Sequence, residues 1–316
     1  MKSRKKVLFI TEKWCDGNPN MGLTNHYHNL FGTLASLDTV EIGIFHFDEY
    51  KYSTGNHVDI EIPKIMDVFK PDIVVVSHLG TSPMNPSRKS YELIHSLGSK
   101  IVFIWPDTRD EIFEMIRSLE DITSLHVSWG FEQAEPIIEN HVWLAVPQDP
   151  SLYNYQKNKQ FEAMFVGSLD GYTHRRPFIE YAKSVGCKLG VTGGQREMKL
   201  SPEDYATVIK ASKISVNFSE SAIKGQHQIK GRVIEALSCG SMLLEYKNDR
   251  TSTLLKPGVH YAEFSSKEDL VEKVNYYLEN DEEREKIAAA GHAYYNSHFS
   301  PVRFWGTIFE RVGVDI

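Results

Sequence analysis

Short runs of apolar and β-branched residues alternate with segments of helical period through the first half of the chain. We predict strands there at 7–11, 41–47, 72–77, 100–105, 125–128 and 142–146. Such alternation is typical of βαβ units built on a parallel sheet. Because residues 73–76 and 101–104 are apolar at every position, both strands should be covered by helices on their two faces. The first half is therefore predicted to be a doubly wound α/β domain.

The alternation breaks at Pro147-Gln148-Asp149-Pro150, and a polar segment, 153–160, follows. This composition is typical of a linker between domains. The pattern then restarts, with predicted strands at 161–166, 188–192, 213–218 and 241–245 and predicted helices at 176–185, 202–210 and 229–238. Helices are also predicted from 267 and from about 281, and a last amphipathic segment covers 302–312. We expect one domain at 1–150, a second Rossmann-like domain at 151–300, and a C-terminal helix within 301–316.

Composition narrows the class of protein. A chain of 316 residues is too long for one ordinary core and suits two domains with a cleft between them. The net charge of −7, without a long basic stretch, argues against nucleic acid as a partner. Cys15, Cys187 and Cys239 are scattered and odd in number, which fits a reducing compartment, so we expect a cytoplasmic protein. No run approaches the roughly 20 apolar residues of a membrane span, although peripheral association with a membrane stays open.

Candidate binding residues follow the strands of the second half. Ligands of open α/β sheets lie beyond the carboxyl ends of the strands. Gly167 and Ser168 form a small-residue turn after the first of these strands, and Arg175 and Arg176 begin the next helix. Helix N-terminal N–H groups and guanidinium groups together favour a diphosphate, although an ordinary turn with solvated arginines explains them as well. Gly193, after the next strand, is a second place where backbone could approach a ligand.

The segment 229–240 is the strongest local feature of the sequence. Arg232 and Glu235 lie three residues apart, hence on one face of a helix. A carboxylate there can accept hydrogen bonds from two ribose hydroxyls, and Lys230 or Arg232 can neutralise a phosphate. The alternative is that Arg232 and Glu235 only pair with each other on the surface.

The first half offers weaker candidates. Gly22 and Thr24 follow the first strand and could face a phosphate or an acceptor, but the full glycine pattern of a dinucleotide site is absent. His78 and Asp107 each follow a later strand and could face a transferred sugar or an acceptor hydroxyl. His26 and His28 have poor spacing for a metal, and we predict no metal site.

Several motifs together resemble the CgeB-like glycosyltransferases, which are allied to the group 1, family 4-like enzymes of the GT-B fold. The motifs are Gly167-Ser168 with the arginines that follow, Lys-Gly-Arg-x-x-Glu-Ala-Leu-x-Cys-Gly at 230–240, Lys256-Pro257-Gly258, Ser-Lys-Glu-Asp-Leu at 266–270, and Tyr-Leu-x-x-Asp-x-Glu-Arg at 277–284. The match covers about residues 161–300. It implies that the second domain binds a nucleotide-sugar, that the first binds the acceptor, and that the final helix crosses back to the first domain.

The resemblance also implies roles for individual residues. It places Glu235 against the donor ribose, Arg232 against the phosphates, and Arg175 or Arg176 after the first turn. His227 departs from the pattern, because the family 4 enzymes have a second glutamate eight positions before the ribose-binding one. We take Gly22, Gly167, Ser168, Arg175, Arg176, Gly193, His227, Lys230, Arg232 and Glu235 as donor-binding candidates, and His78, Asp107 and Arg232 as catalytic candidates.

The expected activity is transfer of a sugar from a nucleoside diphosphate donor to a hydroxyl of a carbohydrate, lipid-linked or protein acceptor. The resemblance implies a reaction that retains the anomeric configuration. We expect Arg232, a second basic residue and a helix N-terminus to stabilise the departing diphosphate in place of a metal. The donor is a substrate, and no cofactor is expected. Two alternatives stay open: a nucleotide-sugar epimerase of similar fold, and an inactive nucleotide-sugar-binding structural protein.

Overall fold

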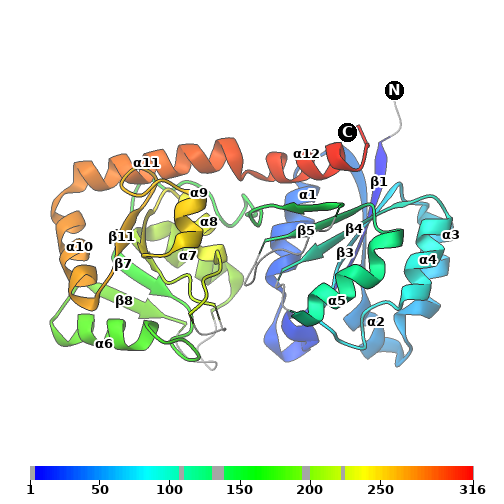
Figure 1. Cartoon of the computed structure of the whole chain (residues 1–316), viewed down its shortest axis with the longest axis horizontal. Coiled ribbons are helices and arrows are strands. Elements are labelled where there is room, and N and C mark those ends of the chain that lie inside the picture. Colours follow the sequence, from blue (N-terminus) through cyan, green and yellow to red (C-terminus); the bar gives the residue numbers. More distant parts are fainter. Residues whose placement is uncertain (1–3, 107–109, 130–138, 194–199, 222–224, 316) are drawn as a thin grey trace. The chain divides into compact units, whose positions relative to one another are not determined.

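The computed structural model describes residues 4–106, 110–129, 139–193, 200–221 and 225–315. The chain divides into two compact units, which we call unit 1 (Met1–Asp149 with Pro301–Ile316) and unit 2 (Pro150–Ser300). Each unit contains one parallel sheet flanked by helices (Figure 1). The predicted fold class, α/β with two Rossmann-like domains, is confirmed.

The sheet of unit 1 has the strand order β2-β1-β3-β4-β5-β6, and every described pair of neighbours is parallel. Its strands are β1 (Lys5–Thr11), β2 (Val40–His46), β3 (Ile73–Ser77), β4 (Lys100–Trp105), β5 (Leu125–Ser128) and β6 (His141–Trp143). The two runs that are apolar at every position form β3 and β4, in the middle of the sheet. Their side chains are buried on both faces, as the sequence pattern predicts.

Two layers of helices cover this sheet, and β1 shows how. Leu8 and Ile10 face one core, with α2 (Phe47–Thr54), α3 (Ile62–Phe69), α4 (Arg88–Ser96) and α5 (Asp110–Leu119). Val7 and Phe9 face the other core, with the π-helical turn η3 (Tyr27–Gly32), α1 (Thr33–Ala35) and α12 (Pro301–Arg311). Successive side chains of a strand point to opposite faces, so both cores take residues from the same strand.

The last helix, α12, packs on the sheet of unit 1 (Figure 1). Its buried stripe is Phe304, Trp305, Ile308 and Phe309, which recur at helical spacing. The indole N–H of Trp305 donates to the hydroxyl of Thr33 at 3.0 Å, and its ring meets that of Phe9 edge-on at 5.7 Å. The amphipathic segment predicted at 302–312 is therefore a core helix.

The sheet of unit 2 has the strand order β11-β10-β9-β7-β8 and is parallel throughout. Its strands are β7 (Phe161–Val166), β8 (Leu189–Thr192), β9 (Ser212–Asn217), β10 (Met242–Tyr246) and β11 (Ala262–Phe264). Its helices are α6 (Arg175–Ser184), α7 (Pro202–Ala211), α8 (Gly231–Ser238), α9 (Asp249–Leu254), α10 (Lys267–Glu279) and α11 (Asp281–His298). One core packs α6, α10 and α11 on the sheet, and a smaller one includes α7.

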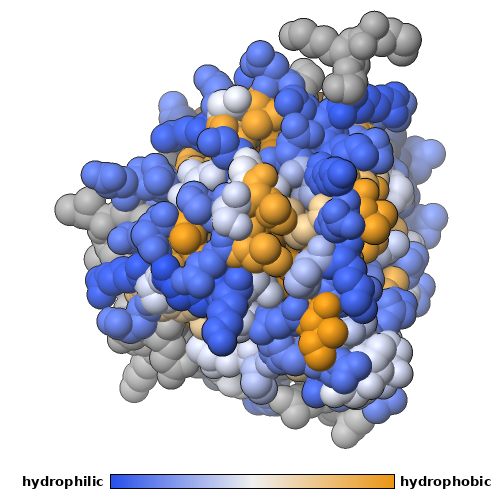
Figure 2. Space-filling view, turned by 90° about the vertical axis from the view of Figure 1, so that its right-hand side faces the viewer, coloured by the Kyte–Doolittle hydropathy of each residue, from blue (hydrophilic) through white to orange (hydrophobic). Residues whose placement is uncertain are grey.

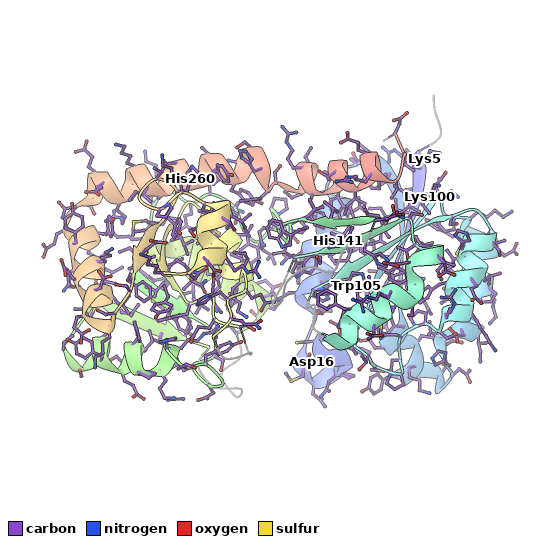
Figure 3. The ribbon with its side chains drawn as sticks, viewed as in Figure 1. Lys5, Asp16, Lys100, Trp105, His141 and His260 are labelled. Carbon is purple, nitrogen blue, oxygen red and sulfur yellow. The ribbon has the colours of Figure 1, made fainter. Side chains whose placement is uncertain are left out.

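Parallel strands bring all their carboxyl ends to one edge of each sheet. In unit 1, β4 runs from Lys100 to Trp105, toward the side on which Asp16 lies, while Lys5 marks the start of β1 at the opposite side (Figure 3). The loops at the carboxyl edges are the places where ligands of such sheets lie. Functional groups are therefore expected in these loops of each unit.

One face of unit 1 is mostly polar (Figure 2). The face turned to the viewer in Figure 2 is mostly hydrophilic over its coloured residues, with apolar side chains in separate small patches. Exposed large apolar residues of unit 1 include Tyr52, Ile60, Val68 and Leu97. Within the described ranges, no helix has the length and apolar character needed to cross a membrane.

Candidate functional site

Two glycines bring bare backbone to the carboxyl edge of the unit 2 sheet. Gly167 follows β7 with a φ of +143°, and Gly193 follows β8 with a φ of +74°. The two turns touch, because the N–H of Gly167 donates to the carbonyl of Thr192 at 2.9 Å. A Cβ at Gly193 would come within 3.3 Å of the Gly167 nitrogen. Glycine is therefore required for this close approach, which leaves the backbone accessible to a ligand.

Arg232, on the first turn of α8, is fixed against this edge by two hydrogen bonds. Its Nη1 donates to the carbonyl of Val166 at 2.8 Å, and its Nε donates to Oδ1 of Asn217, at the end of β9, also at 2.8 Å. A Cβ on Gly167 would overlap the Arg232 guanidinium. A guanidinium carries five N–H groups, so these two bonds leave other donors for a ligand.

The amide of Asn217 is itself held by a buried carboxyl group. Its Nδ2 donates to Oε2 of Glu245 at 2.6 Å, and the backbone N–H of Ser219 donates to the other oxygen at 2.8 Å. Asn217 and Glu245 have no exposed surface. Because Nδ2 faces Glu245, Oδ1 faces Arg232, so Glu245 positions Arg232 through Asn217. Burial raises the pKa of Glu245 to about 7.

Glu235 lies one turn further along α8 and is only 5% exposed. Its Oε2 accepts a hydrogen bond from the hydroxyl of Tyr205 at 2.8 Å. Burial raises the pKa of Glu235 to about 7, against the opposing effects of the Tyr205 hydroxyl and the Arg232 charge. A buried carboxyl group of this kind does not fit the alternative of a surface ion pair with Arg232.

Lys230 caps the start of α8 and lies beside an aromatic ring. Its Nζ donates to Oε1 of Gln228 at 2.7 Å and lies 5.5 Å from the centre of the Tyr172 ring. The guanidinium of Arg175 stacks on the same ring at 3.4 Å. Lys230 and Arg232 both belong to the start of α8, so two cations accompany the glycine turns.

Arg175 braces the site from inside the protein. It is 2% exposed, and it donates to the carbonyls of Ser168 at 2.9 Å and Phe218 at 3.4 Å. Burial and the nearby charge of Arg232 lower its pKa to about 10, which still leaves it charged at neutral pH. Arg175 therefore ties the loops after β7 and β9 together.

Two predicted residues of this loop are directed elsewhere. Arg176 is exposed and forms ion pairs with Asp170 and Glu180. The hydroxyl of Ser168 accepts a hydrogen bond from the N–H of Asp170 at 3.1 Å and so closes the turn. The structure does not bring either side chain to the group around Arg232.

His227 lies in the loop before α8, opposite Glu220 in an isolated antiparallel bridge. Its Nδ1 lies 3.2 Å from Oδ1 of Asp249.

Glu220 is buried and accepts a hydrogen bond from the backbone N–H of His174, whose ring stacks on Tyr246 at 4.8 Å. Sequence reasoning missed Glu220 and Glu245. The available signal was their position, at or just after the ends of β9 and β10.

Unit 1 carries a second polar group at the carboxyl edge of its own sheet. Glu12 directly follows β1 and is 5% exposed. Its Oε1 accepts from the hydroxyl of Thr24 at 2.8 Å and lies 3.5 Å from Nδ1 of His26. Gly22 lies in the same loop with a φ of +74° and open space around it. Glu12 and His26 were not among the residues predicted for the site.

His78 has the surroundings of a core residue rather than a catalytic one. It packs among Tyr91, Phe103 and Trp105, and its Nε2 lies 2.5 Å from the Tyr91 hydroxyl. Burial lowers the pKa of His78 to about 3, so it stays neutral. These surroundings do not support the catalytic role expected for His78. Asp107 lies outside the described residues.

In the described part of the chain, no three His, Cys, Asp or Glu side chains gather in a way that could hold a metal ion. The unit 2 edge instead offers two cations, glycine backbone without side chains, and buried carboxyls. This set of groups suits an anionic ligand that also carries hydroxyl groups.

A family model described as glycosyl transferase-like matches residues 152–310, just over half of the chain. The chain belongs to this glycosyltransferase family. The match contains α8 and both glycine turns, whereas Glu12, Thr24 and His26 lie outside it. No curated protein matches the sequence.

Solved structures with the same fold include further glycosyltransferases. The chain is similar to HepE from Anabaena, determined in complex with UDP and glucose, at 12% identity and a TM-score of 0.60, covering 98% of this chain and 100% of that one. A glycosyltransferase from Rickettsia africae has 9% identity and a TM-score of 0.64, covering 99% and 100%. A Listeria monocytogenes protein proposed to be a UDP-N-acetylglucosamine 2-epimerase has 14% identity and a TM-score of 0.56, covering 98% and 97%. At these identities the likeness establishes the GT-B fold.

Proposed function

We propose that this glycosyltransferase transfers a sugar from a uridine diphosphate donor to a hydroxyl acceptor. The observation that carries the proposal is the arrangement around α8, where Arg232 lies against the Gly167 turn and the buried Glu235 follows one helical turn later. The choice of uridine is supported by HepE, whose structures hold UDP and UDP-glucose. We also propose that the protein belongs to the CgeB-like subgroup of glycosyltransferases.

Each group of the site has a role in binding the donor. Glu235 accepts hydrogen bonds from the ribose hydroxyls, and Arg232 and Lys230 bind the diphosphate. Bare backbone at Gly167 and Gly193 lets the phosphates approach. Because Arg232 is already fixed by Val166 and Asn217, its charge stands where negative charge develops on the departing diphosphate.

We also propose that the reaction needs no metal ion and retains the configuration of the anomeric carbon. Two cations of the chain neutralise the diphosphate in place of a metal. Retention is supported by the resemblance to the family 4-like enzymes alone. Turnover in the presence of EDTA and the anomeric configuration of the product, followed by NMR, test the two points separately.

The first test is calorimetric titration of UDP into the Glu235→Gln variant. The titration is made at pH 8, above the pKa of about 7 of the Glu235 carboxyl group, and the substitution keeps the side-chain volume but removes the negative charge. Charged hydrogen bonds contribute about 1.5–3 kcal/mol each, and about 1.4 kcal/mol corresponds to a factor of ten, so we expect UDP to bind at least tenfold more weakly. The matched control is Glu203→Gln, on the exposed first turn of α7. If Glu235→Gln bound UDP as tightly as the parent, the ribose assignment would be wrong.

The fold of the Listeria protein favours a second candidate, epimerisation of a nucleotide-sugar. An epimerase converts its substrate without an acceptor, whereas a transferase needs one. Incubation of UDP-N-acetylglucosamine with the protein alone, followed by NMR, separates the two. Tight UDP binding without turnover under any of these conditions would favour the inactive binding protein.

A further inference from the structure

The polar group of unit 1 lies outside the residues that the family model matches, and the proposed donor site does not use it. It gathers residues from two connections at the carboxyl edge of the unit 1 sheet. Glu12 follows β1, Thr24 and His26 lie between β1 and η3, and Trp129 follows β5. Residues so far apart in sequence come together here because the strands are parallel.

Glu12 is held at one oxygen and open at the other. Its Oε1 accepts from Thr24 and faces His26. Among the described residues no donor meets the distance and angle of a hydrogen bond to the buried Oε2, and the backbone N–H of Gly17 lies only close enough to the carboxyl group to lower its pKa. Leaving a buried carboxyl oxygen without a partner costs roughly 1–3 kcal/mol. A buried oxygen of this kind indicates a position where a ligand supplies the missing hydrogen bond.

His26 connects this carboxyl group to the outside. Its side chain is 20% exposed, and its Nδ1 lies 3.5 Å from both Glu12 Oε1 and the hydroxyl of Ser77, at the end of β3. The indole of Trp129 meets the imidazole edge-on, with 5.8 Å between the ring centres. An aromatic surface therefore adjoins the polar groups.

The surrounding charge selects the chemistry of the ligand. Asp48 and Asp16 both lie close enough to Glu12 to act on it electrostatically, in the direction that opposes its ionisation. A phosphate would meet three acidic side chains here, which argues against the phosphate contact first considered for this loop. A neutral ligand with several hydroxyl groups avoids this repulsion and can donate to the carboxyl and imidazole groups.

We propose that Glu12, Thr24 and His26 form the subsite that binds the accepting hydroxyl of a carbohydrate. The subsite gives the acceptor of the proposed function a chemical class, and in that sense it rests on that function. The side chains of His26 and Glu12 accept hydrogen bonds from the sugar hydroxyl. Thr24 holds the Glu12 carboxyl group in place, and Trp129 packs against the C–H groups of the sugar ring.

The test measures sugar binding and UDP binding on the same full-length protein. Saturation-transfer NMR is recorded with four probes: methyl β-D-glucopyranoside, methyl β-D-galactopyranoside, methyl α-D-mannopyranoside and methyl N-acetyl-β-D-glucosaminide. We expect the parent to bind at least one probe, and Glu12→Gln and His26→Ala to weaken that binding at least tenfold. UDP affinity should stay unchanged in both variants, because no residue of the donor group is altered.

Matched controls are Glu41→Gln and His95→Ala, which change exposed residues of the same types in unit 1. If Glu12→Gln does not fold, Thr24→Val serves in its place, because it removes only the donor to Oε1. The proposal is overturned if the parent binds UDP but none of the probes, or if the variants bind them like the parent. Probe binding by a parent that does not bind UDP would support the subsite and count against the donor proposal alone.

Discussion

At the scale of single residues, the donor site depends on how Arg232 is held. Its guanidinium donates to the backbone carbonyl of Val166 and to the amide oxygen of Asn217, and neither acceptor is a carboxylate. Two bonds to neutral groups therefore fix the direction of the guanidinium, although Glu235 and Glu245 lie within electrostatic reach of it. Preorganised charge of this kind stabilises a transition state without reorganisation during the reaction.

Gly167→Ala should displace Arg232. The new methyl group would overlap the guanidinium, so we expect the bond to Val166 to break and UDP binding to weaken by about tenfold or more. Gly171→Ala is the control, because its φ of +80° is also positive while open space surrounds the added carbon. Calorimetry with UDP on both variants isolates the effect of Arg232. Equal affinities would show that its position does not matter.

Glu245 should make the stability of unit 2 depend on pH. Burial raises its pKa from 4.5 to about 7, so between these values the unfolded chain has lost a proton that the folded chain keeps. The free energy of unfolding therefore contains a contribution from Glu245 that is complete below pH 4.5 and is lost as the pH rises through 7. The largest possible slope for one group is about 1.4 kcal/mol per pH unit.

The measurement is urea unfolding of the parent and of Glu245→Gln at several pH values from 4.5 to 8. His78 and His126, whose pKa burial lowers to about 3, act in the opposite direction, so the prediction concerns the difference between the two proteins. We expect the variant to lose stability less steeply than the parent as the pH rises. Parallel curves would contradict the assignment.

Sequence alone identifies some of these residues and not others. Arg232 and Glu235 could be predicted, because helical spacing and the position after a strand both apply to them. The burial of Arg175 could not, since a charged residue at a helix start is ordinarily solvated. The role of Glu245 could not be predicted either, because it lies near the end of an apolar strand and only its tertiary contact with Asn217 gives it a role.

At the scale of elements, α12 should contribute strongly to the stability of unit 1. Trp305→Ala removes a fully buried ring and its hydrogen bond to Thr33, and substitutions of this type typically cost about 3–5 kcal/mol. Val302→Ala, at a position that is 66% exposed on the same helix, should change stability by less than about 0.5 kcal/mol. Urea unfolding followed by the near-ultraviolet circular dichroism signal compares the two. Similar losses would mean that α12 is not a core element.

The elements that sequence reasoning found are those with a strong local pattern. The predicted strands 100–105, 125–128 and 161–166 match β4, β5 and β7 at both ends. The prediction from the sequence missed β11 and α9, which have only three and six residues. Elements this short depend on neighbours such as β10 rather than on their own periodicity, so a single sequence carries little signal for them.

At the scale of the whole molecule, the two units should respond differently to loss of the C-terminus. A chain that stops at Ser300 lacks α12, which exposes Val7, Phe9 and the rest of that core face. Unit 2 loses none of its own residues. We expect the truncated protein to lose the cooperative unfolding of unit 1 while it still binds UDP. Loss of UDP binding together with unit 1 would mean that unit 2 does not hold its fold alone.

The packing of α12 on β1 also has a consequence for synthesis. On the ribosome, the strands of unit 1 are made first, but the helix that covers one side of their sheet is made after all of unit 2. The part of this core face that α12 covers, next to Val7 and Phe9, therefore stays exposed while about half of the protein is translated. At elongation rates of roughly 5–20 residues per second, this exposure lasts on the order of ten seconds or more. Unit 2 can complete its fold first. During this interval the nascent chain exposes apolar surface of the kind that chaperones bind.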